Sequence, residues 1–132
     1  MSYSYTANGN ISVSTIVKFD STSPFRVIQA TAASDYLIGV CSESVDKAPI
    51  PQDTSTQYAA IAGEDLKVYL NGDHASLTAA TGGNTAGDLL TSDGSGNGLT
   101  TTTATNSIVG RAEDTVVASA LGRCFINTFS FD

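Results

Sequence analysis

The sequence predicts a small all-β protein with a single domain, and a β-barrel, a tulip-like open sheet and a β-sandwich all fit its pattern. About eight short segments rich in β-forming residues are separated by turns of Gly, Asn, Asp and Ser. The chain has 132 residues, too few for two independent hydrophobic cores of useful size. Hydrophobic residues make up 41% of it and charged residues only 14%, which favours sheets with neutral polar faces.

The first ten residues differ from the rest of the chain. They contain no charged residue, and Met1 and Ala7 are the only ones with an aliphatic side chain. Such a segment cannot form a core element by itself. We therefore predict a flexible N-terminal arm over residues 1–10 and one all-β domain over residues 11–132.

Four apolar residues after the arm share one parity and predict a single strand with one buried face: Ile11, Val13, Val17 and Phe19. The turn residues 20–24 separate this strand from a second β-rich segment at 25–30. The two segments therefore predict a hairpin.

The middle of the chain holds one more strand and an irregular stretch. Residues 37–41 are a short apolar run, typical of a strand buried on both faces, in which Gly39 indicates a bulge or a close backbone contact. Residues 42–57 are polar and contain two of the three prolines, so we expect a surface excursion there. Residues 54–62 fit a short helix capped at Thr54, a strand or a loop.

The clearest hairpin signal lies at residues 66–79, where two alternating segments flank the turn at 71–73. A second hairpin is predicted within residues 88–103, around the glycine-rich tip 93–98.

The C-terminal part predicts two further strands, at residues 108–111 and 122–131. Phe125, Phe129 and Phe131 share one parity of the last strand. Residues 113–121, between the two strands, fit either a helix or a loop.

The charge distribution argues against two classes of partner. The formal net charge is −7, and the six Lys and Arg residues are spread along the chain, so no basic patch for nucleic acid is expected. The longest apolar runs are a few residues, and no signal pattern opens the chain, so no membrane attachment is expected.

The residues that carry chemistry are few, and we predict no catalytic, cofactor-binding or metal site. His74 is the only histidine and would have to serve any base mechanism, but it lies beside a predicted turn. The tip at 93–98 spaces its oxygens as a calcium loop does, yet Ala104 stands where the closing glutamate is needed. A glycine-rich hairpin tip explains it better than calcium does.

Carboxylates and thiols give no stronger signal. Cys41 and Cys124 are neither a disulfide framework nor a metal quartet, and we expect two half-buried free thiols in strands. Three carboxylate pairs are close in sequence, all in predicted turns where solvated acids are common: Glu43 with Asp46, Glu64 with Asp65, and Glu113 with Asp114.

From about residue 16 to the end, the order of segments has a recognisable layout. Its pieces are residues 17–20, 26–31, 37–40, 62–69, 85–94, 108–110 and a closing strand at Arg123. In this layout the chain resembles the small bacteriophage head decoration proteins, also called capsid cement proteins. Residues 1–15 and 113–121 have no confident counterpart in that family.

The resemblance implies a non-enzymatic structural protein of the virion, made in the host bacterial cytoplasm. It would bind the major capsid protein on the outer surface of the capsid. There it would form a homotrimer at three-fold and quasi-three-fold positions and stabilise the shell against the pressure of packaged DNA. We further hypothesise that residues 1–10 become ordered on the shell.

Two other functions remain open at this point. A phage tail or fibre module that binds a carbohydrate or protein ligand would share this composition, but few copies would be present in each particle. An enzyme is the weakest interpretation, since His74 would be its one imidazole base.

Overall fold

The computed structural model describes residues 2–20, 22, 26–32, 37–41, 58–60, 63–102 and 107–130. These residues form strands and turns without a helix, so the predicted all-β class is confirmed. Accordingly, this part of the chain holds no helix that is long and apolar enough to cross a membrane. The strands are β1 (Ser2–Ala7), β2 (Ile11–Ser12), β3 (Thr15–Phe19), β4 (Arg26–Gln29), β5 (Leu37–Cys41), β6 (Tyr58–Ala60), β7 (Asp65–Tyr69), β8 (His74–Thr78), β9 (Leu89–Ser92), β10 (Gly98–Thr100), β11 (Ser107–Ala112) and β12 (Leu121–Ser130).

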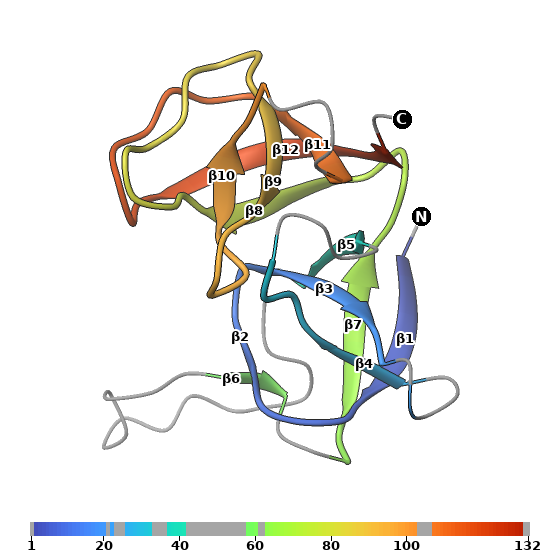
Figure 1. Cartoon of the computed structure of the whole chain (residues 1–132). Coiled ribbons are helices and arrows are strands. Elements are labelled where there is room, and N and C mark those ends of the chain that lie inside the picture. Colours follow the sequence, from blue (N-terminus) through green and yellow to red (C-terminus); the bar gives the residue numbers. More distant parts are fainter. Residues whose placement is uncertain are drawn as a thin grey trace.

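A closed barrel with the strand order β1-β4-β3-β5-β7 fills the lower half of Figure 1. β3 and β4 form the predicted antiparallel hairpin. β1 completes the ring, because it pairs antiparallel with β7 and parallel with β4. The barrel interior is a core of buried side chains from Ala7, Ile11, Val17, Val27, Cys41, Leu66 and Val68.

The flexible arm predicted over residues 1–10 is wrong, because most of it is β1. This strand is paired along its length with β7, Ala7 is fully buried, and the N–H of Asn8 donates to the carbonyl of Val27 at 2.9 Å. The composition of the segment was misleading because the hydrogen bonds of a sheet are made by the backbone. A neutral polar sequence can therefore be a central strand of the barrel.

The upper half of Figure 1 is a five-stranded sheet with the order β10-β9-β11-β12-β8. The hairpin predicted around residues 93–98 is confirmed as β9 and β10, and β11 and β12 match the two strands predicted near the C-terminus. The two edges of the sheet meet where Ala79, just after β8, bridges to Gly98 of β10. The sheet is therefore strongly curved.

The hairpin predicted at residues 66–79 is wrong, although both of its strands and its turn exist. β7 pairs with β1 and β5 in the barrel, whereas β8 pairs with β12 in the upper sheet. The turn between them bonds to β12, since Gly72 N–H donates to Ile126 O and Ile126 N–H donates to Asp73 O, both at 2.9 Å. This tight turn is thus a crossover from one sheet to the other.

The single strand predicted from Ile11 to Phe19 is divided into β2 and β3. The break lies at Ser14, whose φ of 56° is left-handed and cannot continue a strand. β2 pairs with β6, and β3 enters the barrel. Both Ile16 and Val17 are fully buried, because one face of β3 lines the barrel and the other faces the upper sheet.

The ambiguous segments also have a structure in part. Residues 113–121 are a turn-rich loop, in which Val116 bridges to Asn84. Of residues 54–62, the described ones form strand β6. The surface excursion expected at 42–57 lies outside the described residues.

β5 joins the two halves of the molecule. Leu37 and Val40 belong to the core shared with the upper sheet, whereas Cys41 belongs to the barrel core. A bulge sets this orientation, because Val17 of β3 lies opposite Gly39 while Lys18 lies opposite Leu37. The prediction of a strand buried on both faces, with a bulge or close contact at its glycine, is confirmed.

Gly39 provides a test of this arrangement. A Cβ at this position would lie 2.1 Å from the carbonyl oxygen of Tyr69, so Gly39→Ala must separate β5 from β7. We expect the free energy of unfolding, measured by urea denaturation, to fall by about 2 kcal/mol or more. Gly94→Ala is the control, since nothing lies within 4 Å of its added Cβ. Equal stability of the two variants would contradict this account of the barrel closure.

Candidate interaction surface

The outer face of the upper sheet exposes alternate residues of β12. Cys124 and Ile126 are buried in the shared core, so the residues of β12 that alternate with them point outward. Leu121, Arg123 and Phe125 are accordingly exposed on this face. Phe125, one of the three phenylalanines that share a parity in the sequence, therefore lies on the solvent side of the strand.

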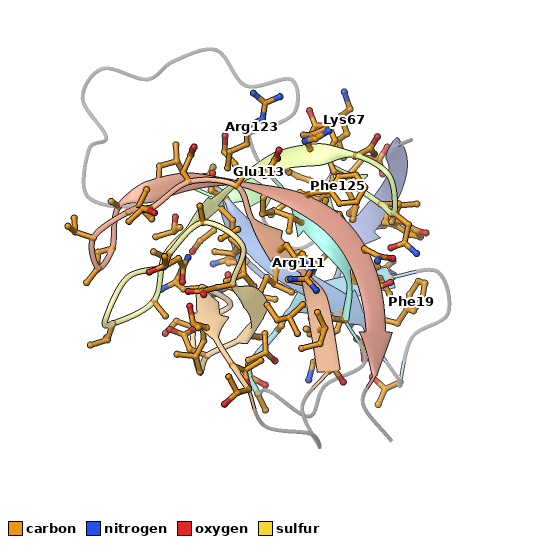
Figure 2. The ribbon with its side chains drawn as sticks, turned by 90° about the horizontal axis from the view of Figure 1, so that it is seen from above. Phe19, Lys67, Arg111, Glu113, Arg123 and Phe125 are labelled. Atoms are coloured by element: carbon orange, nitrogen blue, oxygen red, sulfur yellow. The ribbon has the colours of Figure 1, made fainter. Side chains whose placement is uncertain are left out.

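A row of planar side chains crosses this face. Phe125 lies opposite Arg111 of β11 on one side and opposite His74 of β8 on the other. The rings of His74 and Phe125 have centroids 5.2 Å apart, and Nη1 of Arg111 donates to Gly87 O at 2.9 Å. Figure 2 looks onto this face and shows Arg111, Phe125, Arg123 and Glu113 beside β12, apart from Phe19.

The structure places His74 next to a carboxylate, which the sequence did not indicate. Nδ1 of His74 lies 2.6 Å from Oε1 of Glu113, and Nε of Arg123 lies 3.8 Å from the same oxygen. The backbone N–H of Arg123 donates to Oδ2 of Asp114 at 3.2 Å. The side chains of His74, Glu113 and Arg123 in this cluster are partly exposed. The cluster is suited to polar contacts around a central phenyl ring, as at the rim of a protein interface.

Beside this row, the loop between β11 and β12 carries exposed apolar side chains. Val117 is 76% exposed and Leu121 is 60% exposed. Residues 115–122 contain no charged side chain, although the chain as a whole has a net charge of −7. We call residues 117–121 the apolar tip.

Backbone hydrogen bonds hold the loop of the apolar tip at both ends. Asn84 and Val116 exchange two N–H···O bonds of 2.9 Å, and Ala79 N–H donates to Ala120 O at 2.9 Å. Ser119 N–H donates back to Ala79 O at 3.0 Å. In Figure 1 this orange-red loop and the yellow loop that contains Asn84 project together from the upper sheet. The tip is thus a preformed projection.

A second exposed aromatic is Phe19, the last residue of the barrel strand β3. Phe19 is 49% exposed and packs edge-to-face on Tyr5, with ring centroids 5.7 Å apart. Next to it, the Asp20 carboxylate accepts hydrogen bonds from the Asn8 side chain and from the backbone and hydroxyl of Thr22. These hydrogen bonds, those from Thr22 first, lower the pKa of Asp20.

The glycine-rich tip at residues 93–98 is a hairpin turn that packs on the barrel. Oδ1 of Asp93 accepts the backbone N–H groups of Ser95 and Asn97 at 2.8 and 2.9 Å. The carbonyl of Gly96 accepts the N–H of Ile16 at 2.7 Å, and the Gln29 side chain donates to the carbonyl of Ser95. Asp93, the first residue of the calcium-like pattern, thus stabilises the turn.

The other carboxylates considered from the sequence lie in different parts of the molecule. Glu113 and Asp114 belong to the cluster with His74 and Arg123, whereas Asp65 accepts a hydrogen bond from Thr6 at the barrel rim. Glu43 and Asp46 lie outside the described residues. Among those described, no group of three or more His, Cys, Asp and Glu side chains is arranged to hold a metal ion.

Cys41 and Cys124 are free thiols in strands, as predicted, and both are buried. Burial raises the pKa of Cys41. Burial and the nearby negative charge of Glu113 raise the pKa of Cys124 to about 12. Both thiols are therefore protonated and poorly nucleophilic at neutral pH.

Sequence reasoning missed both the apolar tip and the row across the sheet. The tip has a signal in the sequence, a charge-free run that includes two valines and a leucine between Asp114 and Arg123. The row has none, because Arg111, Phe125 and His74 are brought together only by strand pairing between distant segments.

No protein-family model matches the sequence, and no curated protein matches it. Among solved structures, the fold is similar to the crystal structure of the head fibre gp8.5 N base in bacteriophage phi29. The TM-score is 0.60 at 15% sequence identity, and the alignment covers 96% of this chain and 93% of that chain. A likeness at this level of identity shows a common fold over nearly the full length of both chains.

The burial of the thiols leads to a labelling prediction. We expect neither Cys41 nor Cys124 to react with a thiol reagent at pH 8 in the folded protein, and both to react once denaturant is added. Absorbance from a chromogenic disulfide reagent measures the reaction. Cys124→Ala should halve the signal from unfolded protein, and rapid labelling of a folded chain would contradict the burial described.

The hydrogen bonds of Asp20 lead to a prediction for acid conditions. Because the pKa of Asp20 in the folded protein is below its ordinary value of 3.8, the stabilisation is complete above that pH and is lost as the pH falls through the folded pKa. Asp20→Asn should therefore be less stable than the parent protein by a constant amount near neutral pH, and the difference should narrow below pH 3.8.

Urea denaturation at a series of pH values measures that difference. Asn8→Ala removes one hydrogen-bond donor to Asp20. It should lower the free energy of unfolding of the parent protein, but not that of the Asp20→Asn variant. A difference in stability that grows as the pH falls would contradict a lowered pKa of Asp20.

Proposed function

We propose that this chain is a structural protein of a bacteriophage virion that attaches to the outside of the head and braces the shell. The role is non-enzymatic. The observation that carries the proposal is the match in fold, over almost all of both chains, to the base of a phage head fibre. The layout of the sequence, which resembles head decoration proteins, supports the same class of function independently of the structural comparison.

The architecture suits such a role. The barrel and the upper sheet share one core, with Ile16 and Val40 from the barrel packed among Leu77, Leu90 and Ile126 from the sheet. A molecule built in this way transmits a load through packed side chains and strand pairing. In a homotrimer, attachment also needs only a modest patch for each copy, because three linked contacts act together.

The finer features of the proposal come from the decoration-protein resemblance. They are a homotrimer, seating at three-fold and quasi-three-fold positions, and the major capsid protein as the partner, with no nucleic acid or membrane involved. The hypothesis that residues 1–10 become ordered on the shell is withdrawn, because residues 2–7 are already a strand of the barrel. The ordering of a free arm is therefore no longer part of the proposed attachment.

A second candidate is a phage fibre or tail module that binds a carbohydrate or protein ligand. The specific observation in its favour is that the structure similar to this chain is the base of a fibre. Such a module would occur at few positions of the particle, whereas a cement protein covers the shell.

Copy number separates the two candidates. In purified particles of the phage that encodes this chain, we expect a copy number comparable to that of the major shell protein, measured by quantitative mass spectrometry with labelled reference peptides. A stoichiometry of a few per cent would instead favour the fibre or tail module. Absence of the protein from the particles would reject both.

A further inference from the structure

We infer that the apolar tip, together with Phe125 on the adjoining face of β12, is the surface that docks on the head shell. This inference rests on the proposed function and identifies the side of the molecule that makes the attachment. It would place the apolar tip in an uncharged, apolar recess of the shell protein.

The first reason is the distribution of exposed apolar groups. Four large hydrophobic side chains are exposed among the described residues, and three of them, Val117, Leu121 and Phe125, follow one another from the loop onto β12. The fourth, Phe19, is half-covered by its contact with Tyr5 at the end of the barrel strand β3. Contiguous exposed apolar side chains on a monomer commonly mark an interaction site.

The second reason is the local charge. The chain carries a net charge of −7, but residues 115–122 have no charged group, and the carboxylate of Glu113 beside them lies near the guanidinium of Arg123. An approaching surface meets less repulsion here than elsewhere, and no ion of the tip has to lose its water on docking. Arg123 at the margin adds a side chain of the type enriched in interfaces.

The third reason is rigidity. The hydrogen bonds between Asn84 and Val116 and between Ala79 and Ser119 fix the loop before any partner binds. Gly83 allows this close packing, because a Cβ there would lie 2.3 Å from the carbonyl oxygen of Val116. A preformed tip loses little conformational entropy on docking.

The area favours the shell over a second copy as the occupant. Val117, Leu121 and Phe125 together expose roughly 300 Å² of apolar surface, if a whole large side chain offers about 150–200 Å². A stable interface between two proteins takes about 800 Å² from each partner. The patch alone is too small to hold a dimer, but three such patches linked in the proposed homotrimer would engage the shell together.

The test compares two variants at the patch with two elsewhere. The double variant Val117→Asp, Leu121→Asp places charge in the tip, and Val117→Ser is a milder change at its most exposed side chain. Phe19→Ser removes the aromatic at the barrel rim, and Gly94→Asp adds one negative charge in open space on the β9–β10 hairpin. Melting temperature and size-exclusion elution of each variant check folding and oligomeric state.

Binding to purified heads that lack the protein is then measured by co-sedimentation. We expect the double Asp variant to need at least about tenfold more protein for half-saturation, equivalent to about 1.4 kcal/mol for each binding event. Val117→Ser should weaken binding less, and Phe19→Ser and Gly94→Asp should bind like the parent protein.

The other outcomes are distinct. If the parent protein does not bind heads, the proposed function fails. If it binds and the double Asp variant binds equally well, the function stands and this inference is overturned. The inference is also overturned if Phe19→Ser alone weakens binding, or if the double variant changes the oligomeric state while monomers still bind heads.

Discussion

The fold depends on β5 being buried on both faces. This strand closes the barrel against β7, and its opposite face packs under the upper sheet, as Figure 1 shows. Gly39 makes both contacts possible, because any side chain there would collide with the backbone of Tyr69. The bulge at this glycine then turns Leu37 and Val40 toward the shared core and Cys41 toward the barrel.

The surface chemistry of the molecule follows from that shared core. The inner face of the upper sheet is committed to covering β5 and β3, so Cys124 and Ile126 are buried and Phe125 must face outward. The loop before β12 cannot fold back onto the barrel, since backbone bonds hold it to the loop that contains Asn84. Three of the four large exposed hydrophobic side chains of the described residues, Val117, Leu121 and Phe125, therefore lie in this loop and on β12. The net charge of the whole chain is −7.

The arrangement of His74 and Glu113 resembles part of a catalytic machinery. The two side chains are in contact, but they stand on an open sheet face beside a phenyl ring and a guanidinium. The buried thiols, the other reactive groups of the chain, have raised pKa values. The open sheet face thus combines aromatic, apolar and charged side chains on one surface.

The sequence by itself determined the all-β class, the positions of most strands, the hairpins β3–β4 and β9–β10, and the double burial of β5, because these depend on alternation and turn residues within short segments. Only the tertiary structure decided that β1 is a barrel strand, that the turn at Gly72 leads from one sheet to the other, and that His74, Phe125 and Arg111 form one row. Strand pairing uses backbone groups that nearly every residue carries, so the side chains of a strand do not by themselves determine which strand pairs with it. The choice is made by the packing of distant segments around a common core.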